Sequence, residues 1–216
     1  MVKAILFDFD GTLANTLPLY VKVYERALKK FGFDFSDKKI VRECFGKTEE
    51  TICKNLGIPD KSKGFSSLYF SGVDDCFNDA QLFDGVLETL KLAKEKGIKL
   101  AVVSFAYRWY VDRMLSLLDL SKYFELVIGF ENVENPKPDP EAVLTACEKL
   151  NIDPQNSVVI GDSKSDMMMG NSAGTQTILF HPENYNLFYD LKTLKSSKPN
   201  NIAPDFDRIR KILNLD

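Results

Sequence analysis

The chain begins with a short apolar segment that ends in acidic residues. Residues 2–7 include Val2, Ile5 and Phe7, and Asp8-Phe-Asp-Gly11 follows directly. A nearly unbroken apolar run bounded by a turn signal is typical of a strand buried on both faces of a parallel sheet. We therefore predict a first strand over residues 2–7.

The next part of the chain has the periodicity of helices. After Thr16 and Pro18, apolar residues recur at intervals of three and four positions as far as Gly32. Three more helices are predicted at 36–45, 48–56 and 61–78. A crossover between strands needs only one helix, so we predict an inserted helical domain over 16–82 and a core domain formed by 1–15 and 83–216.

Alternation of strands and helices returns after residue 85. Strands are predicted at 98–104, 126–129, 157–160 and 177–180. Helices are predicted at 86–97, 107–118, 139–150, 164–173 and 205–213. This order predicts right-handed crossovers and a parallel sheet, hence a Rossmann-like α/β core with an all-helical cap. Residues 195–201 are expected to form a surface loop.

Composition and charge narrow the class of protein. The chain has 216 residues, 44% of them hydrophobic, and a net charge of −3, which argues against a nucleic-acid-binding protein. No apolar stretch approaches the roughly 18 residues of a membrane span, and the first residues lack the apolar region of a signal peptide. Cys44, Cys53, Cys76 and Cys147 show no CxxC spacing. We expect a cytoplasmic protein with reduced thiols and no membrane or nucleic-acid partner.

Polar residues follow four of the predicted strands. The ends of parallel strands share one edge of a sheet, where ligands bind in open α/β folds. Buried acids cost several kcal/mol unless they are paired or bind a metal, so this pattern favours a cation site, although Asp-Phe-Asp-Gly alone is also typical of a solvated turn. The residues concerned are Asp8, Asp10, Ser104, Lys137, Asp162 and Asp166.

Four short motifs resemble those of the haloacid dehalogenase (HAD) superfamily. They are Asp8-Phe-Asp-Gly-Thr-Leu13, Ser104, Lys137-Pro138 and Gly161-Asp162-Ser-Lys-Ser-Asp166, in the order of the family and across nearly the whole chain. The helical block resembles the cap of the phosphoglycolate phosphatase and β-phosphoglucomutase-like branch. The resemblance implies a Mg²⁺-dependent phosphatase that acts on a small phosphorylated metabolite through an aspartyl-phosphate.

The resemblance also implies a role for each residue. Asp8 is the expected nucleophile, and Asp10 the expected general acid and base. Mg²⁺ is expected on the Asp8 carboxylate, the Asp10 carbonyl and Asp162, with Asp166 acting through water or by orienting the other ligands. Asp10 argues against the dehalogenase members, which generally lack it. Ser104 and Lys137 are also expected to act in catalysis, with Lys137 neutralising charge on Asp8 and on the transferring group. The expected phosphate-binding residues are Gly11, Thr12, Ser104, Phe105, Ala106 and Lys137.

Two stretches depart from a simple match. Gly46-Lys47-Thr48 mimics the end of a nucleotide-binding loop, but Val41 stands where that loop needs glycine. Lys47 is therefore either a solvated residue or a cap residue that reaches an anionic leaving group. Phe105 stands where the family often has a small polar residue after the second-motif serine. The aromatic stretch Phe105–Tyr110 either lines the site or packs under the cap. His181 is expected at the surface.

Two other functions stay open at this point. A phosphomutase of the β-phosphoglucomutase type would use the same residues, because a mutase differs in the lifetime of its phosphoenzyme. A non-catalytic phosphate-binding protein is disfavoured, because binding alone needs neither a nucleophile nor an acid. The expected partner is a small phosphorylated metabolite, and the expected assembly is a monomer or a small homo-oligomer.

Overall fold

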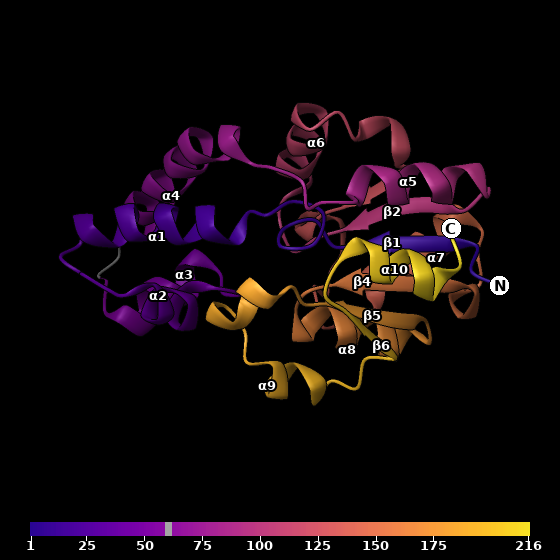
Figure 1. The fold of residues 1–216 in the computed structure, drawn as a ribbon. Coiled ribbons are helices and arrows are strands. Elements are labelled where there is room, and N and C mark those ends of the chain that lie inside the picture. The colour runs from indigo at the N-terminus through magenta and orange to yellow at the C-terminus, as the bar shows by residue number, and fades with distance from the viewer. Residues whose placement is uncertain (59–61) are drawn as a thin grey trace. The chain divides into compact units, whose positions relative to one another are not determined.

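The computed structural model describes residues 1–58 and 62–216, which form two compact units (Figure 1). The core unit consists of Met1–Asn15 and Leu82–Asp216, and the helical unit of Thr16–Gln81. The second boundary lies one residue before the one expected from the sequence. Within the described residues, no helix combines the length and the apolar character that crossing a bilayer requires.

The core unit is built on a six-stranded sheet in which every neighbouring pair is parallel. The strand order is β3-β2-β1-β4-β5-β6, so the direction of winding reverses between β1 and β4. The strands are β1 (Ala4–Phe7), β2 (Lys99–Val103), β3 (Leu126–Ile128), β4 (Ser157–Gly161), β5 (Gln176–Phe180) and β6 (Asn201–Ala203). The α/β fold class predicted from the sequence is confirmed.

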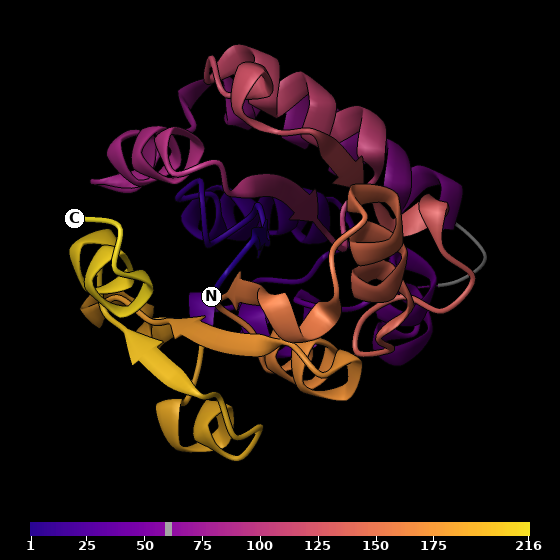
Figure 2. The ribbon, with the colours of Figure 1, turned by 90° about the vertical axis from the view of Figure 1, so that its right-hand side faces the viewer.

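Helices cover both faces of this sheet (Figure 2). On one face, α7 (Glu141–Leu150) and α8 (Lys164–Ala173) pack against each other and against the central strands. On the other, α5 (Val86–Glu95) contacts β2 and α10 (Phe206–Leu213) contacts β6. In the sequence, α6 (Arg108–Leu117) connects β2 to β3. Because helices shield both faces, the strands read as nearly continuous apolar runs.

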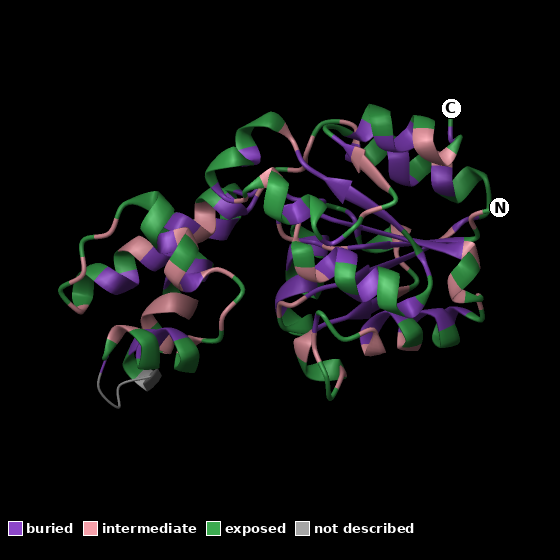
Figure 3. Cartoon of the chain, turned by 90° about the horizontal axis from the view of Figure 1, so that it is seen from below, coloured by how far each residue is buried: buried purple, intermediate pink, exposed green. Residues whose placement is uncertain are grey.

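The core lies between the sheet and its helices. All four residues of β1 are buried, and their side chains alternate between the two faces. Ala4 and Leu6 join Ala101 and Val103 of β2 against Val143 of α7. Each fully buried Val or Leu side chain stabilises the fold by about 1.5–3 kcal/mol. Figure 3 shows this pattern of burial: the strands are buried, and the outer faces of the helices are exposed.

The helical unit contains α1 (Leu17–Lys30), α2 (Asp37–Cys44), α3 (Glu49–Leu56) and α4 (Ser62–Cys76), and no strand runs through its described residues. The longest helices, α1 and α4, pack together. Gly72 allows their close approach, because a Cβ there would lie 3.1 Å from Val23. The first residue of the predicted helix 61–78 lies outside the described residues.

The last part of the core unit differs from the sequence-based expectation. Residues 195–201 were expected to be a surface loop, but Lys195 ends a short helix, α9 (Leu191–Lys195), and Asn201 begins β6. The peptide N–H of Thr177 donates to Asn200 Oδ1 (2.8 Å), which fixes this turn beside β5. A three-residue strand is too short to show a period of two. His181, expected at the surface, is 7% exposed.

Candidate active site

The candidate site begins where β1 and β4 end side by side. Phe7 pairs with Ile160, and the peptide N–H of Asp8 donates to the Ile160 carbonyl (2.8 Å). This pairing brings Asp8 next to Asp162, which follows β4. Carboxylate oxygens of Asp8, Asp162 and Asp166 lie within 4.8 Å of one another. The topology therefore gathers three acids from distant parts of the sequence at the switch point of the sheet.

A single lysine joins two of these acids. Lys137 Nζ donates to Asp8 Oδ1 (2.9 Å) and to Asp166 Oδ1 (2.6 Å). Its side chain is 4% exposed, and that of Asp166 is fully buried. Burial acts to lower the pKa of Lys137, but the Asp166 and Asp8 carboxylates outweigh it and raise that pKa. Lys137 therefore carries its positive charge inside the cluster.

Asp166 is held on all sides. Its Oδ2 accepts from the peptide N–H (3.0 Å) and the hydroxyl (2.6 Å) of Ser163, which caps α8. Gly161 lies directly against it, and a Cβ at position 161 would overlap the Asp166 side chain. Glycine at the end of β4 is thus what lets Asp166 reach Lys137. Both oxygens of Asp166 are occupied by donors from the protein.

One positive charge does not balance three buried carboxylates. Burial, opposed by Lys137 and reinforced by Asp166, raises the pKa of Asp8 from 3.8 to about 7. Burial and the Asp8 charge raise the pKa of Asp162 well above its ordinary value. Asp162 Oδ2 is buried and has no hydrogen-bond partner among the described residues. An unpartnered carboxylate oxygen within an all-oxygen donor set fits a hard cation such as Mg²⁺.

The turn after β1 carries the second acid. Gly11 has φ +79°, a left-handed conformation that glycine adopts without strain, and the chain there turns back so that Ala14 N–H bonds Phe9 O (3.1 Å). Asp10 Oδ1 accepts a hydrogen bond from the hydroxyl of Tyr110 (2.9 Å). Thr12 Oγ1 lies 3.5 Å from Asp162 Oδ1, so the turn also reaches the cluster.

The expected phosphate-binding residues after β2 lie at the same edge of the sheet. Ser104 is nearly buried, and its N–H donates to the Ile128 carbonyl (2.9 Å). Its Oγ accepts from the N–H of Ala106 (3.1 Å), which closes a tight turn before α6. The ring of Phe105 packs edge-on against Phe130 (5.2 Å between centroids). Part of the aromatic stretch thus packs within the core unit itself.

Lys47 belongs to the helical unit. Its Nζ donates to the carbonyl of Arg42 (2.9 Å) and lies 3.9 Å from Glu43 Oε2. The proposed reach of Lys47 to a leaving group stays a prediction.

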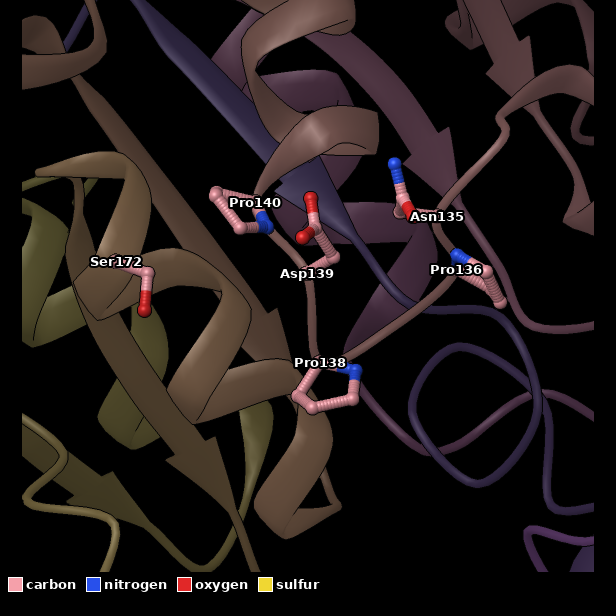
Figure 4. A pocket seen from close by; sticks show the side chains of 6 residues that line it. All are labelled: Asn135, Pro136, Pro138, Asp139, Pro140 and Ser172. Atoms are coloured by element: carbon pink, nitrogen blue, oxygen red, sulfur yellow. The ribbon is translucent and has the colours of Figure 1, made fainter.

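The loop that carries Lys137 has a second, separate face. Lys137 enters the carboxylate cluster, while its neighbours border a shallow pocket of about 470 Å³ (Figure 4). Ser172 of α8 faces the loop across this pocket. The pocket residues are Asn135, Pro136, Pro138, Asp139, Pro140 and Ser172. None of these is a predicted site residue, so the pocket is distinct from the carboxylate cluster.

Sequence reasoning did not assign the tyrosines at the site, which include Tyr110, Tyr185 and Tyr189, a neighbour of Asp162. Tyr110 lay in the aromatic stretch whose role was left open, and its place on the buried face of α6 was the available signal. Tyr185 is fully buried and donates to the Gly11 carbonyl (2.9 Å). It belongs to the segment after β5, where the sequence has no period to read.

Known proteins share this fold. The haloacid dehalogenase-like hydrolase family matches residues 5–180. A phosphorylated carbohydrates phosphatase from Thermotoga maritima is 33% identical over 182 residues, which cover 82% of this chain and 84% of the relative. A predicted phosphoglycolate phosphatase from Haemophilus somnus 129pt has a TM-score of 0.86 at 26% identity, covering 98% of each chain. A putative β-phosphoglucomutase from Thermotoga maritima has a TM-score of 0.81 at 29% identity, covering 99% of each chain.

The chain belongs to the haloacid dehalogenase-like hydrolase family. The resemblance inferred from its four motifs is therefore confirmed. So is the enzyme class, a hydrolase of the phosphatase type, since relatives that match most of the chain are phosphatases.

Proposed function

We propose that this phosphatase depends on Mg²⁺ and hydrolyses a small phosphorylated metabolite through an aspartyl-phosphate on Asp8. The observation that carries the proposal is the bond from Lys137 to Asp8 (2.9 Å) inside a cluster of three carboxylates. An ammonium in that position favours the ionised form of Asp8, which the reaction needs, against the burial that opposes it. It also lowers the repulsion that an incoming phosphate would meet.

The first step transfers the phosphoryl group to the enzyme. A carboxylate oxygen of Asp8 forms a bond to phosphorus while the ester oxygen leaves, and Asp10 gives its proton to that oxygen. In the second step a water attacks phosphorus, Asp10 takes a proton from the water, and the bond to Asp8 breaks. Inorganic phosphate leaves, and both carboxyl groups return to their starting states. Lys137 remains charged throughout and compensates the negative charge that collects beside Asp8.

The metal ligands proposed for Mg²⁺ are the carboxylates of Asp8 and Asp162 and the backbone carbonyl of Asp10. Of the two roles expected for Asp166, we propose the orienting one, because both of its oxygens already accept bonds from Lys137 and Ser163. When bound, the cation neutralises charge between the nucleophile and the phosphate. The remaining phosphate oxygens are assigned to Ser104 and to the N–H groups of residues 105 and 106, where a phosphate would compete with Ser104 Oγ for the N–H of Ala106.

The substrate is proposed only as a class. Similar proteins are described as phosphatases of phosphorylated carbohydrates and of phosphoglycolate, which share a small anionic phosphoester. Lys47, from the helical unit, is the proposed contact to an anionic leaving group. The buried, unpaired thiols of Cys44, Cys53 and Cys147 support a proposed location in the reducing cytoplasm.

The test is turnover of p-nitrophenyl phosphate by the purified chain, with Mg²⁺ or with EDTA. We expect phosphate release with Mg²⁺ only, and none from Asp8→Asn. Asp84→Asn, which changes an exposed acid of the same unit, is the matched control and should act like the wild type. An inactive wild type that still binds inorganic phosphate would instead establish a binding protein. A screen of metabolite phosphates then identifies the substrate.

A phosphomutase is the second candidate, favoured by the structural similarity to a putative β-phosphoglucomutase. Product analysis separates the two functions. Interconversion of sugar phosphates without net release of phosphate would replace hydrolysis with phosphoryl migration as the function of the site.

A further inference from the structure

Tyr110 is a polar side chain at the site to which the proposed mechanism gives no role. Its hydroxyl donates to Asp10 Oδ1 (2.9 Å), 100 positions earlier in the chain. The residue is 5% exposed. Its ring packs edge-on against that of Phe9, the residue between Asp8 and Asp10 in the sequence (6.3 Å between centroids). The contact therefore links the start of α6 to the turn that presents the general acid.

The start of α6 is fixed by contacts of its own. The N–H of Arg108 donates to both carboxylate oxygens of Glu131 (3.0 Å each). Gly129, after β3, lies directly under this turn, since a Cβ at that position would be 2.7 Å from the Arg108 Cα. Tyr110 then falls on the buried face of the helix, with Val111 and Met114. A hydroxyl on so well-anchored a ring can hold a neighbouring carboxylate in one orientation.

We propose that Tyr110 is a positioning residue that orients Asp10 as the general acid and base of the reaction, an inference that rests on the proposed function. Donation to Oδ1 fixes the orientation of the carboxyl group that gives its proton to the leaving group and later takes one from water. Without the hydroxyl, the Asp10 side chain samples rotamers in which that proton does not reach the ester oxygen. Tyr110 itself touches no reacting atom.

This role predicts a dependence on the leaving group. A p-nitrophenolate ion leaves without protonation, whereas an alkoxide needs the proton of Asp10. Tyr110→Phe keeps the ring that packs on Phe9 and removes only the hydroxyl. We expect it to lower kcat/KM about tenfold to 100-fold for an alkyl phosphate and less than about threefold for p-nitrophenyl phosphate, because charged hydrogen bonds are among the strong ones. We compare kcat/KM because it reports the steps up to and including phosphoryl transfer to Asp8. It excludes the later hydrolysis of the aspartyl-phosphate, which is the same for all substrates.

Two comparisons isolate the effect. Tyr123→Phe, the removal of the same atom elsewhere in the core unit, should leave both substrates unaffected. In an Asp10→Asn background, Tyr110→Phe should cause no further loss, because the group that it orients is already inactive. If the role were purely structural, Tyr110→Phe would lower kcat/KM for both substrates by the same factor and would also lower the unfolding midpoint. The same loss of kcat/KM would then appear in the Asp10→Asn background.

The outcomes separate this inference from the proposed function. Suppose that the wild type releases phosphate and Asp8→Asn does not. If Tyr110→Phe then lowers kcat/KM equally for both substrates, or for neither, only the positioning role is wrong. If the wild type fails to release phosphate with Mg²⁺ from any ester, the proposed function is wrong and the role of Tyr110 falls with it.

Discussion

Asp8→Asn should make the metal-free protein more stable while it abolishes turnover. The change keeps the volume of the side chain almost constant and removes one negative charge from a cluster of three carboxylates and one ammonium. The pKa of Asp8 is raised from 3.8 to about 7, chiefly by burial, with Lys137 opposing and Asp166 adding to the rise. A raised pKa means that ionising this carboxyl costs the folded state free energy that the unfolded chain does not lose.

The size and the sign of the effect follow from that shift. From 3.8 to about 7 is roughly three units, which at about 1.4 kcal/mol each gives an upper value of about 4 kcal/mol. Asp8 shares Lys137 with Asp166, so about 2–4 kcal/mol is the expected range. Between the two pKa values the folded state binds more protons, so the free energy of unfolding of the wild type falls as pH rises. Asn at position 8 does not ionise, so the free energy of unfolding of the variant does not fall in this way.

The measurement is urea unfolding in EDTA, followed by tryptophan fluorescence at several pH values. Trp109 is the one tryptophan of the chain, so the signal reports the core unit. The two proteins should match below about pH 4, diverge up to about pH 7 and then differ by a constant amount, the variant being more stable. Adding Mg²⁺ should narrow the difference.

Asp84→Asn again serves as the control, since it changes an exposed acid outside the carboxylate cluster. A gap that does not vary with pH, or a wild type that is the more stable protein above pH 7 in EDTA, would show that the cluster is not electrostatically strained. The reasoning from burial and charge would then be wrong.

Two further substitutions test other parts of the site, and a labelling experiment tests the helical unit. Because it removes acid–base catalysis, Asp10→Asn should lower the rate with an alkyl phosphate by about 10²–10⁴-fold. The urea midpoint should stay nearly unchanged, and full activity would exclude the acid–base role of Asp10. Gly161→Ala should overlap Asp166, lower kcat, and destabilise the core unit by about 1–3 kcal/mol in urea unfolding; a wild-type midpoint would contradict the close packing. Burial, opposed by Lys47, raises the pKa of the Cys44 thiol to about 12, so iodoacetamide near neutral pH should label Cys44 far more slowly in the folded protein than in urea, as measured by peptide mass spectrometry.

The sequence was sufficient to predict the residues that form the carboxylate cluster. Asp8 and Asp162 follow apolar runs that are typical of buried strands, and a parallel sheet puts the ends of such strands at one edge. The contact of Lys137 with Asp166 needed more, because a loop has no period and its path depends on packing. The resemblance to the family predicted that Lys137 would lie beside Asp8, whereas its bond to Asp166 was not predicted.

Other features were invisible for physical reasons. The three residues of β6 are too few to show alternation, so their pairing with β5 emerges only in the folded sheet. The burial of His181 depends on the segment that follows β5, whose Tyr185 packs beside it (6.5 Å between ring centroids). Tyr110 was visible as an aromatic residue on a helix, but its partner Asp10 lies across a contact that no local pattern encodes.

Ala14 and Leu82 form an antiparallel bridge, and the N–H of Phe83 donates to the carbonyl of Leu13 (3.2 Å). The chain thus leaves the core unit and re-enters it at adjacent points, like the two ends of a cassette. A gene encoding a different insert between these points need only close the same short gap, because Asp8, Asp10, Lys137 and Asp162 all lie outside the exchanged stretch. Recombination at this junction can therefore diversify one module of the enzyme while the residues proposed to react are inherited unchanged.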